Sequence, residues 1–322
     1  MTSFNQTNFL RNTAIGFETM SLGASHAAKD NVALGYRALK AVTSGIDNTA
    51  VGSQSGVALT TQSYNISIGA NSLSVINAGS GGNVAIGHES MKSSGTATNN
   101  NAEYNTAIGY EALKDITTGY TNVAVGKGAG ENITTGHSNV AIGTGALDVS
   151  TDVDYAVIIG KNAGEANMTS SADGAIGIGY KALSALTSGA SNTAIGYEAL
   201  KTAATEAQSV AIGYQSMSTT SNGSNNTMVG YSTGKFLTAG NDNNTGIGHD
   251  ALSGVHAGTS EKNTAIGSGS MAGAINGAVR NTAIGVDSLA VLTSGDDNVA
   301  LGWGRIVTGK QHQLQYYELL HL

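Results

Sequence analysis

The sequence predicts an all-β fold, a parallel β-roll or β-solenoid of about 17 coils. The first observation is a phrase of the Asn-Thr-Ala-Ile-Gly type that recurs seventeen times between residues 12 and 302. The second is its spacing, since nine of the sixteen intervals between the final glycines are 17 residues long. That length is too short for a helical-hairpin repeat and suits one coil of a solenoid. The third is the absence of proline from all 322 residues, as expected where most backbone amides serve a ladder.

The Thr-Ala-Ile segment of each repeat predicts a short strand, because it is β-prone and alternates. The residue before the glycine is Ile, Val or Leu in every copy, so we expect it to form the core stripe. Four residues after the glycine lies a second apolar column, mostly Leu or Met. It is less strictly kept, and we expect it to face a partner chain. The segment that contains this column is expected to form a second short strand in each repeat.

Two further columns have expected structural roles. A glycine in every copy indicates a backbone angle or a close chain approach that a Cβ would block. Asparagine stands four residues before that glycine in fourteen copies. In register, these side chains are expected to build a ladder of amides, each donating to the next.

The repeats divide the chain into three parts. Residues 12–304 form the repeat domain, and residues 1–11 are expected to be an N-terminal cap or an attachment segment. Residues 305–322 are expected to be a C-terminal cap, because a solenoid end needs its last coil covered. The alternative for this segment is a distal tip, at which Tyr316, Tyr317 and His312 would touch a receptor.

Composition excludes several classes of partner. The formal net charge of −7 argues against a phosphate-binding surface, so nucleic acid is not expected as a partner. The first ten residues lack the basic and apolar regions of a signal peptide, and no apolar run is long enough for a membrane span. The chain has no cysteine and therefore no disulfide framework.

The tandem Asn-Thr-Ala-Ile-Gly-x-x-Ala-Leu phrase, complete at Asn105–Leu113 and Asn192–Leu200, resembles the head repeats of trimeric autotransporter adhesins. It is more similar to the related repeats of bacteriophage tail fibres. This resemblance implies a homotrimer of left-handed parallel β-rolls whose surface binds a host.

Because the sequence shows no signal peptide, coiled-coil stalk or membrane barrel, we expect a phage tail-fibre protein of the virion. Such a protein would present a surface that binds a host glycan or receptor protein, and its N-terminus would join an upstream fibre or baseplate protein. The alternative is a bacterial cell-surface adhesin or extracellular fibre. A polysaccharide depolymerase and an ice-binding solenoid are weaker alternatives.

No catalytic, cofactor-binding or metal site is predicted. Gly126–Gly130 resembles a phosphate loop only superficially, because it lies in the repeat frame. The seven histidines lack paired ligand spacing. Asp152 and Asp154 fit a solvated loop. The position after each repeat glycine is often aromatic. Rings in register there would stack sugar rings, or else cover the roll or pack between chains. The candidate ligand-binding residues are Tyr197, Tyr214, Tyr231, Trp303, Tyr316 and Tyr317.

Overall fold

The computed structural model describes residues 11–21, 27–79, 81–93, 100–220, 223–238, 240–256 and 258–304. Contacts divide the chain into two compact units, Met1–Ala156 and Val157–Leu322. Within the described ranges, neither unit contains an α-helix, and the one helical element is a 3-10 turn, η1 (Ser170–Ala172). Each unit is a parallel β-solenoid, which confirms the predicted all-β fold.

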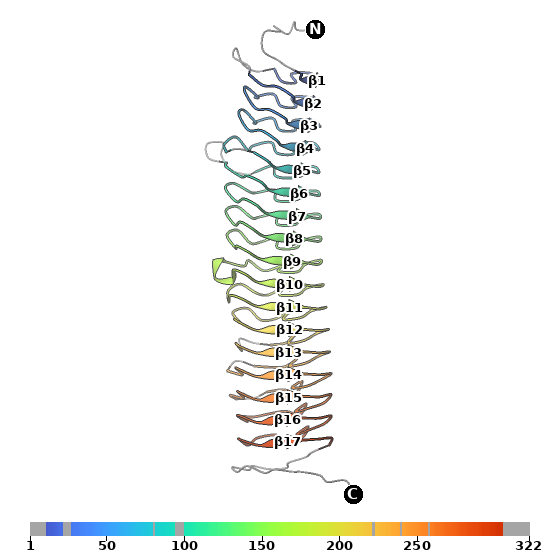
Figure 1. Cartoon of the computed structure of the whole chain (residues 1–322), viewed down its shortest axis with the longest axis vertical. Coiled ribbons are helices and arrows are strands. Elements are labelled where there is room, and N and C mark those ends of the chain that lie inside the picture. Colours follow the sequence, from blue (N-terminus) through green and yellow to red (C-terminus); the bar gives the residue numbers. More distant parts are fainter. Residues whose placement is uncertain are drawn as a thin grey trace. The chain divides into compact units, whose positions relative to one another are not determined.

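Each repeat contributes one strand of three residues, and consecutive strands pair in parallel within each unit (Figure 1). The first unit contains β1 (Thr13–Ile15), β2 (Val32–Leu34), β3 (Thr49–Val51), β4 (Ile66–Ile68), β5 (Val84–Ile86), β6 (Thr106–Ile108), β7 (Val123–Val125) and β8 (Val140–Ile142). The second contains β9 (Val157–Ile159), β10 (Ile176–Ile178), β11 (Thr193–Ile195), β12 (Val210–Ile212), β13 (Thr227–Val229), β14 (Thr245–Ile247), β15 (Thr264–Ile266), β16 (Thr282–Ile284) and β17 (Val299–Leu301). The register places like on like, as where Ala124 pairs with Ala141.

The core of each coil lies under the middle residue of the strand. Ala33 is 0% exposed, whereas Leu34, which directly precedes the glycine, is 44% exposed. Successive side chains of a strand point to opposite faces, so the first and third residues of each strand lie on the outside together. The expectation that the aliphatic residue before the glycine forms the core stripe is therefore wrong. The middle column, mostly alanine, takes that place, and a leucine of the turn packs against it, since a Cβ on Gly177 would lie 3.2 Å from Cδ1 of Leu183.

The second apolar column is the true large-residue core. Leu113 and Leu200 are both 0% exposed, so the expectation that this column faces a partner chain is also wrong. Where glycine replaces the leucine, another side chain fills the space. A Cβ on Gly56 would lie 3.1 Å from Cδ1 of Leu59, a buried residue supplied by the same coil.

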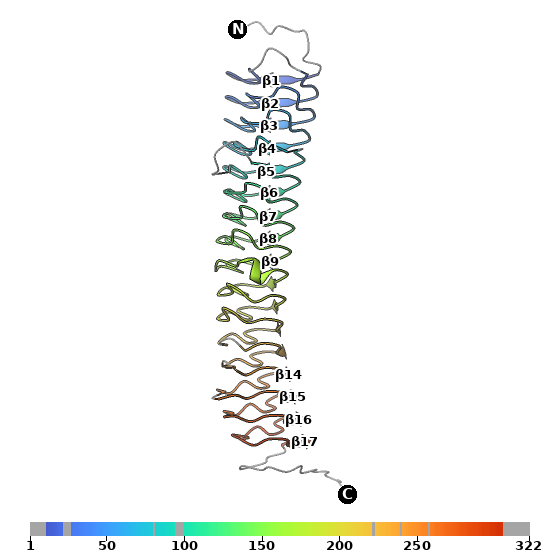
Figure 2. The ribbon, with the colours of Figure 1, turned by 90° about the vertical axis from the view of Figure 1, so that its left-hand side faces the viewer.

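The segment after the glycine is a turn rather than the predicted second strand. Two of its residues in each coil adopt a left-handed backbone, as at Glu111 (φ 56°) and Leu113 (φ 48°), which a pleated strand does not allow. The segment still stacks through backbone hydrogen bonds between coils, since the Leu113 N–H donates to the Ala129 carbonyl at 3.0 Å. Figure 2 shows these turns repeating from coil to coil within each unit.

The repeat glycine has both of the roles predicted for it. Gly196 has φ +141°, and a Cβ there would lie 2.2 Å from the carbonyl oxygen of Gly213. That is far inside van der Waals contact. No other residue type fits without moving the backbone of the next coil.

The asparagine ladder is confirmed. Nδ2 and the backbone N–H of Asn48 donate to Oδ1 of Asn31 at 3.0 and 2.9 Å. Nδ2 also donates to the Gln62 carbonyl at 2.9 Å, so the side chain joins three successive coils. The same pattern links Asn298 to Asn281 in the second unit. Because these amides are buried, the ladder satisfies polar groups that water does not reach.

Candidate functional site

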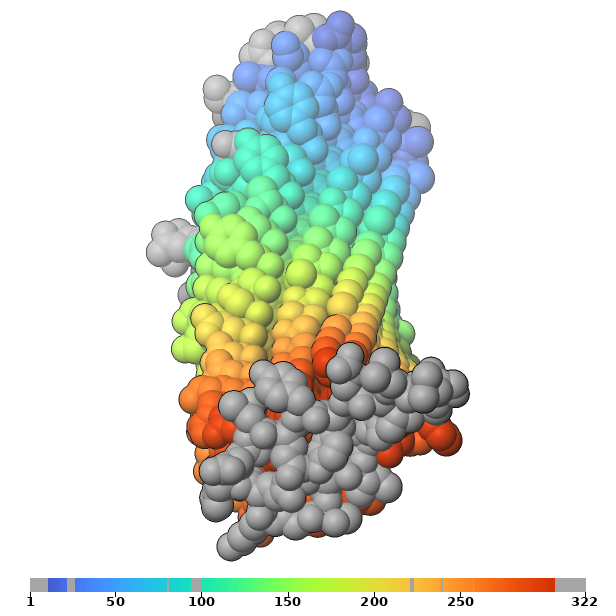
Figure 3. Space-filling view, turned by 60° about the horizontal axis from the view of Figure 1, so that its bottom comes forward, coloured from blue at the N-terminus to red at the C-terminus, as the bar shows by residue number. Residues whose placement is uncertain are grey.

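The first candidate surface is the outer strand face, which we define as the first and third residues of each strand. These residues are Ile, Val, Leu or Thr in every described strand, and none is charged. The members that are large and exposed are Ile15, Val32, Leu34, Ile66, Ile68 and Ile108 in the first unit and Ile247, Ile284 and Leu301 in the second. Figure 3 shows side chains of successive coils lying in parallel rows within the second unit. The third residue is aliphatic in every described strand, and an aliphatic row that is exposed or half-buried favours association.

The second candidate surface is the aromatic row that follows the repeat glycines. In the second unit Tyr180, Tyr197, Tyr214, Tyr231 and His249 stack ring on ring, with centroids 4.9 to 5.1 Å apart and interplanar angles of 8° to 22°. Shorter stacks in the first unit join Phe17 to Tyr36 and His88 to Tyr110. The alignment expected from the repeat is therefore present.

The stacking decides which parts of these rings a ligand can reach. Tyr197 and Tyr214 each have a ring on both faces, and Tyr231 lies between Tyr214 and His249. A sugar ring needs an open aromatic face, so it has none on these three residues. Their edges and hydroxyl groups remain accessible, since the side chains are 41% to 50% exposed. Loss of surrounding water raises the pKa of the Tyr197 hydroxyl.

The other expected ligand-binding residues lie towards the C-terminus. Trp303 is 78% exposed. Tyr316 and Tyr317 lie outside the described residues, as do most of residues 1–11 and the whole segment 305–322.

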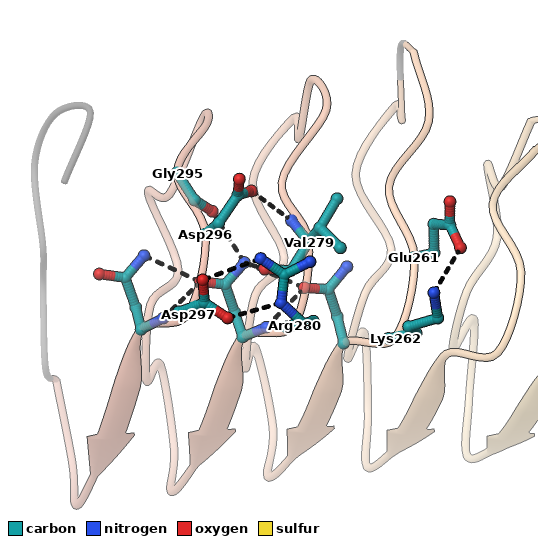
Figure 4. A network of polar contacts seen from close by, with 10 residues as sticks. Glu261, Lys262, Val279, Arg280, Gly295, Asp296 and Asp297 are labelled. Carbon is teal, nitrogen blue, oxygen red and sulfur yellow. Dashed lines mark hydrogen bonds and ion pairs between the residues drawn. The ribbon is translucent and has the colours of Figure 1, made fainter. Parts of the chain in front are cut away.

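Charged side chains form ion pairs in the segments that come just before the strands. Figure 4 shows Arg280 reaching Asp297 of the next coil, with Nε–Oδ1 and Nη2–Oδ2 distances of 2.6 and 2.8 Å. Asp296 accepts the Val279 N–H at 2.9 Å, and Lys262 lies 3.3 Å from Glu261. The Arg280 side chain lowers the pKa of Asp297 through its hydrogen bond. These exposed ion pairs are solvated and contribute little to stability.

Among the described residues of the second unit, two titratable side chains are buried. Oε2 of Glu206 accepts a hydrogen bond from Thr220 Oγ1 at 3.2 Å, and Oε1 has no partner in the described structure. Burial raises the pKa of Glu206 to about 8. His256 places Nε2 3.1 Å from the Leu252 carbonyl, and burial lowers its pKa to about 4. Neither group reaches the surface, so both bear on stability rather than on binding.

A third candidate surface brings together residues from successive coils of the first unit. Tyr120, His137 and Asp154 occupy the same repeat position, and His137 Nε2 lies 3.1 Å from Asp154 Oδ2. The expectation of a merely solvated loop at Asp154 overlooked this pair. The signal was present, because 17 residues separate each of these side chains from the next.

The described residues contain no group of three or more His, Cys, Asp or Glu side chains placed to hold a metal ion. Among those same residues, no helix is long and apolar enough to span a bilayer.

No protein-family model matches the chain, and no curated protein matches its sequence. The fold class therefore rests on the repeat and the structure alone.

Proposed function

We propose that the chain is a structural fibre protein and adhesin of the phage tail-fibre type, which spaces and presents a surface that binds a host glycan or protein. The observation that carries the proposal is the outer strand face. The coils already bury an alanine column and a leucine column, so the outer strand face, with one aliphatic row and one row of Thr, Val and Ile, is not needed for the single-chain core. Uncovered apolar rows favour association with a partner.

The partner that fits the outer strand face best is a second copy of the same chain. A copy carries the same rows at the same coil spacing, so the faces of parallel copies can pack in register around a common axis. The face has no charge and so offers nothing to a charged partner. We propose a homotrimer of left-handed β-rolls, in line with the resemblance to adhesin and tail-fibre repeats.

In this proposal the protein belongs to the virion, and its N-terminus joins an upstream fibre or baseplate protein. A bacterial cell-surface adhesin is the second candidate, because a uniform, repeat-built fibre suits either setting. Immunogold labelling separates the two: a phage fibre carries label on virions, and an adhesin carries it on intact cells.

Attachment is tested with the full chain, purified and fluorescently labelled, on a panel of bacterial strains. A host-binding fibre labels a subset of strains, saturably, and unlabelled protein competes. If no strain is labelled and neither virions nor cells carry the protein, the proposed function is wrong.

A further inference from the structure

The cluster around His137 differs from the aromatic row in how its rings are arranged. Tyr120 stacks on His137, with centroids 4.5 Å apart and an interplanar angle of 20°. The Tyr155 ring stands nearly perpendicular to His137, at 84° with centroids 5.1 Å apart. Tyr155 is 61% exposed, and no ring of the described residues lies parallel to it. It therefore keeps the open aromatic face that the central rings of the stacked row lack.

Polar groups beside this face are held in place from two coils. Asp154 binds His137 twice, since Oδ1 accepts the His137 backbone N–H at 2.8 Å and Oδ2 lies 3.1 Å from Nε2. Nδ1 of His137 lies 3.4 Å from Ser138 Oγ, which lies 3.0 Å from Thr121 Oγ1. The His137 and Asp154 side chains are only 20% and 23% exposed. Their geometry is thus fixed before any ligand arrives, which lowers the entropy cost of binding.

An aromatic face beside a row of hydroxyl, imidazole and carboxylate groups matches the two sides of a pyranose. The C–H face of such a sugar packs on an aromatic ring, and its hydroxyl groups donate to carboxylate and accept from hydroxyl or imidazole. The charge of the row selects further. Glu103 occupies the same repeat position one coil before Tyr120, so acidic residues stand at both ends and disfavour an anionic sugar.

We propose that Tyr155, His137 and Asp154 form a binding site for a neutral pyranose unit of a surface glycan. This inference rests on the proposed function and gives the adhesin a ligand class and a location. Tyr155 would supply the stacking face, and the Asp154 carboxylate, which His137 holds in place, would accept hydrogen bonds from the sugar hydroxyls.

The test uses the full chain on a glycan array that carries neutral hexose oligosaccharides beside sialylated and uronic-acid oligosaccharides. Wild-type protein is expected to bind neutral hexoses. Tyr155→Ala should weaken that binding about tenfold, which corresponds to about 1.4 kcal/mol, and Tyr155→Phe should retain it. Tyr64→Ala is the matched control, because Tyr64 has the same repeat position, a similar φ (61° against 57°) and a similar exposure of 62%.

Thermal melting of each variant checks that it folds, and His137→Gln gives an independent readout, with an expected loss of neutral-hexose binding. The inference is overturned if Tyr155→Ala and His137→Gln bind like wild type, or if only acidic sugars bind. If the wild-type protein labels bacterial strains but binds no neutral sugar on the array, this inference fails and the proposed function stands. If it labels no strain and binds no sugar, both fail.

Discussion

Replacing Glu206 with glutamine is expected to remove a pH-dependent loss of stability. The carboxyl group is fully buried, with one oxygen bonded to Thr220 and the other unpartnered. Gln62 occupies the same repeat position in the first unit and accepts the Thr60 N–H at 2.7 Å through Oε1. A glutamine side chain is therefore already accommodated at this position of a coil.

The sign follows from the direction of the shift. Burial raises the folded-state pKa of Glu206 to about 8 from the ordinary value of 4.5, so the folded state holds its proton more tightly than the unfolded state. The stability that the protonated Glu206 carboxyl contributes is fully present below pH 4.5 and is lost as pH rises through 8. Between pH 4.5 and pH 7 the difference of 2.5 units corresponds to about 3 kcal/mol. The full interval of 3.5 units corresponds to about 5 kcal/mol.

The assay is urea-induced unfolding of wild type and Glu206→Gln at several pH values from 4.5 to 9. The free energy of unfolding of Glu206→Gln, relative to wild type, should increase by about 3 kcal/mol between pH 4.5 and pH 7. Glu198→Gln serves as the control, because the hydrogen bond from Lys201 lowers the pKa of Glu198. Its contribution to stability therefore changes mainly below pH 4.5, and the difference between Glu198→Gln and wild type should stay nearly constant across the assay range. A constant difference between wild type and Glu206→Gln across the range would refute the reasoning.

Three other substitutions test the coil itself. Gly196→Ala should destabilise the fold by about 1 to 3 kcal/mol in thermal melts. Gly174→Ala should destabilise it less, since no atom lies within 4 Å of a Cβ built on Gly174. Equal losses of stability would contradict the close-approach account. Asn139→Ala should cost about 1 to 3 kcal/mol, because it leaves the buried Val153 carbonyl and the Ala156 N–H without their partner; an unchanged melting temperature would exclude a stabilising ladder. His256→Leu should reduce the loss of stability between pH 6.5 and pH 4. The reason is that the folded-state pKa of His256 lies at about 4, so wild type loses stability as pH falls towards that value. Parallel pH profiles of the two proteins in urea unfolding would show that His256 does not titrate as described.

The sequence predicted those parts of the fold that depend on identical residues stacking on each other. The repeat glycine and the asparagine ladder fall in this class, since each needs only its own copy one coil away. Inside and outside were reversed because hydrophobicity alone assigns an isoleucine to the core, whereas a leucine or methionine of the second apolar column already fills most coils. Two larger residues, Ile158 and Met228, lie in the alanine column and are buried. In both coils glycine replaces the leucine of the second apolar column, since a Cβ on Gly164 would lie 3.3 Å from Ile158 Cγ2 and a Cβ on Gly234 would lie 2.8 Å from Met228 Cγ.

The candidate sites were predictable to a different degree. The repeat register predicts that the tyrosines of the aromatic row lie together. It does not predict the orientation of their rings, which stack so that each central ring covers the faces of its neighbours. The His137 and Asp154 pair did have a signal in the sequence. Two polar residues one repeat length apart must stack, so a column-by-column search for chemistry would have found them.

Sedimentation equilibrium of the full chain tests the central claim most directly, namely that the outer strand face joins copies of this chain. Three chains of 32.3 kDa give 3 × 32.3 = 96.9 kDa, and we predict this mass. Ile108→Glu, on the outer strand face, should shift the mass towards that of one chain, and Tyr64→Glu, an exposed position outside that face, should not. A well-folded wild-type monomer of 32.3 kDa would contradict the account.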